Sequence, residues 1–106
     1  MTIGQFSESA NLSRDTIRYY ISEGILAPDK GTRYIFNKDC FEDLKMYQDS
    51  RRFGISHMDT LRMLRVRRVL GTSDLLFRSF YRRLLKERME QLAAERDEWQ
   101  AVLGTL

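Results

Sequence analysis

The chain has 106 residues, of which 18 are Lys or Arg and 15 are Asp or Glu, with one cysteine, Cys40, and one histidine, His57. One thiol and one imidazole exclude an intrachain disulfide and cysteine-cluster or multi-histidine metal sites, and no nucleophile–base pair or phosphate loop suggests an enzyme. No segment has the pattern of a signal peptide or a membrane span, so we expect a soluble, cytoplasmic protein with no membrane partner and no cofactor. The positive excess lies in residues 1–73, with 12 basic and 9 acidic side chains, where a nucleic-acid footprint is expected.

The first two predicted helices are short and close together. Thr2 opens a capping-box pattern that starts the first helix, which ends near Asn11. Ser13 is the expected N-cap of a second helix over residues 14–23, and Gly24 is placed to end it. Its inward face carries an i,i+4 pair of isoleucines, Ile17 and Ile21. Two short helices joined by about three residues form the helix-turn-helix pattern.

The next segments predict a small hairpin and two further helices. Residues 28–31 (PDKG) indicate a turn, and the aromatic, β-prone residues 34–36 indicate a hairpin or wing. Asn37 is the expected N-cap of a third helix that closes near Phe53. A fourth helix opens at Ser56, and one face of it is expected to carry three apolar residues, Met58, Leu61 and Leu64.

The C-terminal segment predicts one long helix. Neither Pro nor Gly occurs from Asp74 to Leu103, so about 30 residues can form a helix roughly 45 Å long. The apolar side chains within residues 75–85 can pack on the N-terminal part of the same chain. Beyond them an apolar seam recurs at heptad spacing, interrupted by Arg96. The seam residues are Leu85, Met89, Leu92, Trp99 and Leu103.

The seam indicates an intersubunit coiled coil and therefore a homodimer, because an exposed Trp99 on an isolated helix would leave a large apolar surface in water. We expect residues 1–72 to form a head and residues 73–106 to form the dimerisation helix. The alternative is a monomer whose long helix folds back on its own head. The pattern alone does not give the orientation of the two helices.

The second helix carries the candidate DNA-binding residues. With its isoleucines turned inward, Arg14 and Arg18 share one outward face, where guanidinium groups can reach guanine edges or phosphates. Thr16 and Tyr19 can donate hydroxyl hydrogens to phosphate oxygens. The alternative interpretation is a basic face that is only solvated.

The run Leu12-Ser13-Arg14-Asp15-Thr16-Ile17-Arg18-Tyr19-Tyr20, preceded by Ile3-Gly4-Gln5-Phe6 and followed by Gly24-Ile25-Leu26 and Pro28, resembles the signature of the MerR family. Later segments, Phe36-Asn37-Lys38-Asp39 and Arg52-Phe53-Gly54-Ile55-Ser56, are also similar, so that the resemblance spans about residues 2–70.

The resemblance implies a mostly α fold, with a winged helix-turn-helix head, a small β-hairpin wing and a long C-terminal dimerisation helix. It further implies a transcription regulator that binds double-stranded DNA at a pseudo-palindromic promoter site as a homodimer, through an antiparallel coiled coil. RNA polymerase at the promoter is the further partner it suggests. The DNA contacts implied are Arg14, Thr16, Arg18 and Tyr19 on the recognition helix, and Arg33 on the wing.

The wing departs from the family pattern. A wing Arg usually lies two residues before the aromatic that precedes the helix cap, whereas Arg33 lies three before Phe36. Lys30 is therefore an alternate phosphate contact. Arg52, together with Arg51, is a candidate backbone contact beyond the wing, although a solvated pair fits the pattern equally well.

The expected chain is a short form without an effector-binding domain, and its effector is unknown. Cys40 is either a reactive thiol near a helix N-terminus or a small semi-buried residue. The aromatic residues Phe77, Phe80, Tyr81 and Trp99 either line an apolar pocket or belong to the core. Two other functions stay open: an architectural or excisionase-like DNA-binding accessory protein, and a coiled-coil adaptor for an acidic protein.

Overall fold

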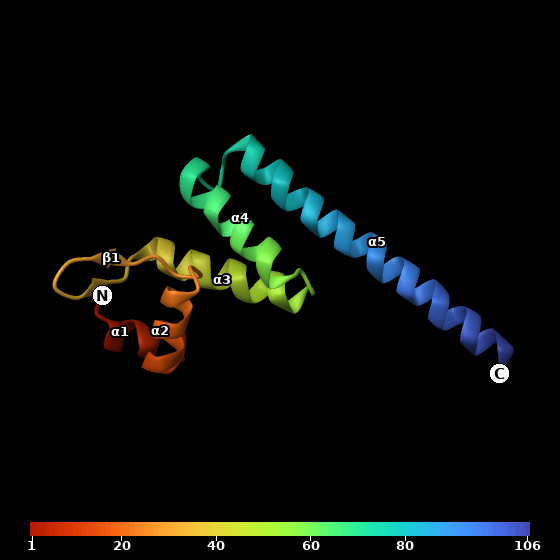
Figure 1. The fold of residues 1–106 in the computed structure, drawn as a ribbon, viewed down its shortest axis with the longest axis horizontal. Helices are drawn as coiled ribbons and strands as arrows, with labels where there is room; N and C mark the ends of the chain where they lie inside the picture. Colours follow the sequence, from red (N-terminus) through yellow and green to blue (C-terminus); the bar gives the residue numbers. More distant parts are fainter. The chain divides into compact units, whose positions relative to one another are not determined.

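The computed structural model describes residues 1–106 and divides them into two compact units, residues 1–50 and 51–106. The chain is mostly helical, with a single two-stranded antiparallel sheet, as the sequence predicts. The elements in chain order are α1 (Ile3–Ala10), α2 (Arg14–Ser22), β1 (Asp29–Lys30), β2 (Tyr34–Ile35), α3 (Lys38–Arg52), α4 (His57–Leu70) and α5 (Leu75–Thr105) (Figure 1).

Local capping fixes the ends of the first two helices. The Gln5 amide donates to Thr2 Oγ1 at 3.2 Å while the Thr2 amide donates to Gln5 Oε1 at 2.8 Å, which completes the predicted capping box. The first helix ends at Asn11, which adopts the left-handed conformation at φ 55°, a conformation that Asn tolerates better than most residues. Ser13 caps the second helix, and Gly24 follows it at φ 80°. These predicted boundaries are confirmed.

An aromatic cluster forms the core of the first unit. The Phe6 ring is fully buried and lies 4.6 Å from the Phe36 ring and 4.6 Å from the Phe41 ring, measured between centroids. Ile17, on the inner face of α2, is fully buried, whereas Ile21 is only partly buried. The core thus holds the inner face of α2 and leaves its outer face in solvent.

The hairpin differs from the prediction in one respect. Asp29 pairs with Ile35, and Lys30 pairs with Tyr34, so Asp29 and Lys30 are the first strand rather than part of the turn. The turn is formed by residues 31–33 instead. Phe36 directly follows the second strand and is 2% exposed, so the hairpin leads the chain back into the core.

Helices α3 and α4 begin as predicted. The Cys40 amide donates to Asn37 Oδ1 at 3.2 Å, and the Asp59 amide donates to Ser56 Oγ at 3.1 Å. On α4 the prediction for Met58 is wrong, since this side chain is 58% exposed. Leu61 and Leu64 are buried as predicted, together with Thr60, Met63 and Arg67. Met58 lies two positions before Thr60 and therefore about half a turn away from it.

The long helix is a single element, as predicted. Asp74 caps it by accepting hydrogen bonds from the amides of Leu76 at 2.8 Å and Phe77 at 3.2 Å. Its 31 residues correspond to roughly 45 Å. Figure 1 shows α5 (blue) returning alongside α4 (green) and then continuing well beyond it.

Only part of the first half of α5 is buried. Phe77 is 2% and Leu84 is 7% exposed, whereas Leu75 and Leu76 are exposed at 77% and 71%. Every residue from Met89 to Leu106 is exposed in the single chain. The seam residues beyond the half-buried Leu85 are therefore uncovered in the single chain, whereas the fold-back alternative would bury them.

Candidate nucleic-acid interface

The outward face of α2 presents a pair of oppositely charged side chains. Arg18 Nη1 lies 3.1 Å from Asp15 Oδ1, and these side chains are 57% and 97% exposed. An ion pair this exposed contributes little stability, so the guanidinium can exchange the carboxylate for another acceptor. The geometry thus leaves Arg18 available to a ligand, with Asp15 as its counterion in the free chain.

Arg14 lies against a glycine on the neighbouring helix. A Cβ atom on Gly4 would lie only 2.8 Å from Arg14 Nη2, so the guanidinium rests against the bare backbone of α1. Sequence reasoning missed this role of Gly4. The available signal was a glycine inside a predicted helix, where it costs about 1 kcal/mol relative to Ala and so calls for a packing reason.

The two hydroxyl groups on this face have partners in the free chain. Ser13 Oγ donates to Thr16 Oγ1 at 2.8 Å, which leaves the Thr16 hydroxyl hydrogen free to donate outward. A hydrogen bond to Glu23, reinforced by the charge of that carboxylate, raises the pKa of Tyr19. The Tyr19 side chain is 55% exposed, so its hydroxyl can turn from Glu23 to a phosphate oxygen.

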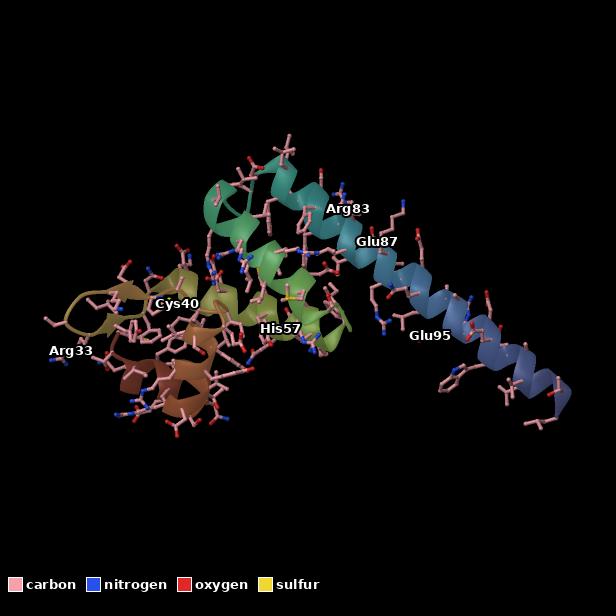
Figure 2. The ribbon with its side chains drawn as sticks, viewed as in Figure 1. Arg33, Cys40, His57, Arg83, Glu87 and Glu95 are labelled. Atoms are coloured by element: carbon pink, nitrogen blue, oxygen red, sulfur yellow. The ribbon has the colours of Figure 1, made fainter.

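The wing adds two cations to the same unit. Lys30 is exposed on β1, and Arg33 is exposed in the turn that follows it. Figure 2 shows the Arg33 side chain at the hairpin, pointing outward. The first unit therefore carries six of the seven predicted DNA contacts.

The seventh, Arg52, belongs to the second unit. It lies at the end of α3 with its guanidinium carbon 5.3 Å from the centre of the Phe53 ring.

A comparison with family models decides what this arrangement is. Residues 1–65 match the model described as MerR HTH family regulatory protein. The chain belongs to the MerR family. It is therefore a DNA-binding transcription regulator and not an enzyme.

A solved MerR-family structure has the same fold. It is a crystal structure assigned to a transcriptional regulator of this family from Listeria monocytogenes, with a TM-score of 0.66 and 23% sequence identity. The alignment covers 99% of this chain and 79% of that chain. No curated protein matches the chain.

Metal and thiol chemistry find little support in this MerR-family chain. No group of three or more His, Cys, Asp or Glu residues is placed to hold a metal ion. Cys40 is 2% exposed, and burial raises the pKa of its thiol, which disfavours the reactive thiolate. The structure thus favours the interpretation of Cys40 as a core residue. No helix is long and apolar enough to cross a bilayer.

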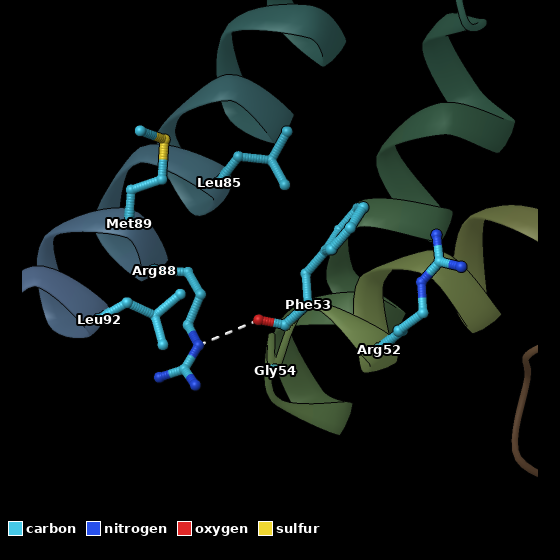
Figure 3. Close-up of a pocket in the computed structure, with 7 residues that line it drawn as sticks. All are labelled: Arg52, Phe53, Gly54, Leu85, Arg88, Met89 and Leu92. Carbon is cyan, nitrogen blue, oxygen red and sulfur yellow. Dashed lines mark hydrogen bonds between the residues drawn. The ribbon is translucent and has the colours of Figure 1, made fainter. Parts of the chain in front are cut away.

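Of the two interpretations of the aromatic residues of α5, the apolar pocket that includes Trp99 does not form. Phe77 and Tyr81 stack on each other at 6.2 Å, whereas Trp99 is 22 residues further along the same helix, roughly 33 Å from Phe77. An apolar groove of about 560 Å³ lies elsewhere in the second unit, beside the turn after α3 (Figure 3). It is lined by Arg52, Phe53, Gly54, Leu85, Arg88, Met89 and Leu92.

Proposed function

We propose that this MerR-family regulator binds a pseudo-palindromic promoter element as a homodimer. In this proposal residues 1–72 form the DNA-binding head and residues 73–106 form the helix that pairs two subunits. The observation that carries it is the exposed apolar seam of α5, where Trp99 is 75% and Leu103 is 69% exposed. Two copies that share this seam would present two recognition helices to two half-sites.

Each α2 enters the major groove in this proposal. Arg14 and Arg18 read base edges or clamp phosphates, and Thr16 and Tyr19 fix the depth of the helix through phosphate contacts. The support is that Arg14, Arg18 and Tyr19 are exposed on α2 and Thr16 is half-exposed, whereas Ile17 on the same helix is fully buried.

Lys30, Arg33 and Arg52 contact the flanking backbone. A phosphate contact carries no sequence information, so their loss would weaken binding to all sequences alike.

The promoter is the second part of the proposal, with RNA polymerase as a further partner there. Its support is membership of a family of transcription regulators. Transcription in vitro from a promoter that carries the operator, with and without the protein, tests this part. A protein that binds the operator and leaves the transcript level unchanged would contradict it and favour an architectural accessory role.

The DNA-reading assignment is tested with operator selected from random duplexes and measured by gel shift. Arg18→Ala should lose specific binding while the dimer persists, and Arg18→Lys should keep the charge but lose about tenfold or more in discrimination, because Lys cannot make the bidentate contact. The matched control is Arg83→Ala, which removes one exposed cation from α5. Operator binding by Arg18→Ala equal to that of the control would refute the assignment.

A further inference from the structure

The two units of the chain differ in charge. Residues 1–50, which include the recognition helix, hold six Lys or Arg and eight Asp or Glu, whereas residues 51–106 hold 12 basic and seven acidic side chains. Part of the basic excess is concentrated on α4, where four arginines occur within residues 62–68 and Asp59 is the only acidic residue of the helix. The proposed DNA contacts use none of these arginines, so DNA binding does not account for the charge of α4.

Four exposed residues lie on one side of α4 and are called the α4 stripe: Met58, Arg62, Arg65 and Val69. Their spacing of four, three and four positions places them within about 60° of one another around the helix axis. The stripe is roughly 17 Å long. It has an apolar side chain at each end, since Met58 is 58% and Val69 is 82% exposed, and two cations between them.

The α4 stripe is separate from the apolar seam of α5. It lies about half a turn around α4 from Thr60 and Arg67, which are buried. Helix α5 packs against α4 within the same unit, so the exposed stripe belongs to a side of α4 that α5 does not cover (Figure 1). A chain bound to the stripe would therefore contact α4 and not the seam.

Both cations of the stripe are available to a carboxylate. Arg65 is exposed and makes no hydrogen bond or ion pair within the chain. Arg62 Nη1 lies 3.2 Å from Asp59 Oδ1, and these side chains are 61% and 38% exposed, so this pair adds little stability and can be exchanged. A guanidinium group binds a carboxylate through two parallel hydrogen bonds, which makes an acidic side chain a fitting partner for each.

The chemistry of the stripe discriminates among the kinds of partner. A second copy of the stripe would bring arginine against arginine, which like-charge repulsion disfavours. A nucleic-acid backbone would satisfy the arginines but would leave Met58 and Val69 against phosphates, with no apolar surface to cover them. An amphipathic helix with carboxylates between apolar side chains satisfies both the charges and the apolar ends.

We propose that the α4 stripe binds an acidic amphipathic helix of another protein. Apolar side chains of that helix lie against Met58 and Val69, and its carboxylates bind Arg62 and Arg65. The spacing of the stripe is the same read from either end, so a partner helix with matching spacing fits it in both directions. This site adds a protein partner to the DNA partner, and it requires neither the operator nor the pairing of two subunits.

A designed peptide tests the site. The probe is a fluorescently labelled helical peptide with leucine at its first and twelfth positions and glutamate at its fifth and eighth, on a background of alanine and glutamine. The control peptide has lysine in place of both glutamates. In an anisotropy titration of the full chain, the acidic peptide should bind and the control peptide should not, because only the first places carboxylates on the arginines.

Variants of the stripe locate the binding. Arg65→Glu should weaken the acidic peptide by about tenfold or more, because a cation is replaced by a repelling charge. Val69→Ser should weaken it by about fivefold, through the loss of one apolar contact. The matched control is Lys45→Glu on α3, which makes the same change of charge at a side chain that is 78% exposed and should leave peptide affinity unchanged. Circular dichroism and operator binding should be the same for all three variants.

Three results would overturn the proposal. The first is an acidic peptide that does not bind the natural chain, and the second is equal peptide affinity in Arg65→Glu and Lys45→Glu. The third is a duplex without operator that loses as much affinity as the peptide in Arg65→Glu, which would make the stripe a nucleic-acid surface. The DNA-reading assignment fails separately, through Arg18→Ala, which does not touch α4.

Discussion

Gly54, in the turn after α3, should be far less replaceable than its exposed position suggests. It adopts φ 85°, and a Cβ atom at this position would lie 2.6 Å from Arg88 Nε. That nitrogen donates to the carbonyl of Phe53 at 3.0 Å. Gly54→Ala therefore strains the backbone and also pushes a guanidinium away from its acceptor.

The expected loss of unfolding free energy is the sum of the backbone strain and the lost hydrogen bond. A non-glycine residue in the left-handed region costs about 1–2 kcal/mol. The displaced guanidinium can swing into solvent without a lasting clash, so its cost is the lost hydrogen bond, about 1 kcal/mol at this partly exposed site. Gly54→Ala should thus lower the free energy of unfolding by about 2–3 kcal/mol. Gly24 has φ 80° and open space around its Cα, so Gly24→Ala should show only the backbone cost.

Urea unfolding followed by circular dichroism measures both variants. All samples are compared at one protein concentration, because any association of folded chains adds to apparent stability. In an Arg88→Ala background the cost of Gly54→Ala should fall to that of Gly24→Ala. Equal costs for the two glycine variants in the natural background, or an unchanged Gly54→Ala cost without Arg88, would refute the reasoning.

Three further variants test other parts of the structure. Phe6→Ala removes a fully buried ring and should cost about 3–5 kcal/mol of unfolding free energy by urea titration, and a loss below 1 kcal/mol would place the core elsewhere. Ser13→Ala removes the acceptor of the Thr16 amide and should cost about 1 kcal/mol, whereas Ser13→Asp should restore most of it. Burial raises the pKa of the Cys40 thiol, so its contribution to stability is complete below the ordinary thiol pKa and is lost as the pH rises through the raised one. The unfolding midpoint should therefore fall more steeply at alkaline pH for the natural chain than for Cys40→Ser, and parallel pH profiles would contradict this.

Helix ends were predictable because their signals are local. Thr2, Ser13 and Ser56 each accept a hydrogen bond from an amide three residues ahead, and Asp74 accepts from amides two and three ahead. Such a bond requires only a short polar side chain at the right offset, and the sequence displays it. The length of α5 was equally visible, since no proline or glycine interrupts residues 75–103.

Features that depend on distant residues were not predictable. The inward face of α4 passes through Thr60 and Arg67, which an apolar pattern does not include, and Met58 was therefore assigned to the wrong side. The groove joins Phe53 to Leu85 and Met89, more than 30 positions further along the chain. The hydrophobic periodicity of one helix cannot reveal this contact, because the contact depends on how the chain turns between α4 and α5.

The candidate DNA-binding face was predictable as a set of side chains but not as a set of contacts. Helical spacing put Arg14 and Arg18 on the outer side of α2, and both are exposed. Their resting partners, the bare backbone of Gly4 and the carboxylate of Asp15, follow from packing and rotamer choice.

The ion pair on α2 has a bearing on how the protein would find its target. A guanidinium that is paired with a neighbouring carboxylate attracts DNA phosphates less strongly than an unpaired guanidinium. Complexes with DNA of unrelated sequence should therefore be short-lived. Because both side chains are so exposed, a phosphate or a base edge can readily replace Asp15 as the partner of Arg18, and the carboxylate then returns to water. The intrahelical pair therefore lowers the net positive charge that the outer face of α2 presents to DNA before it binds.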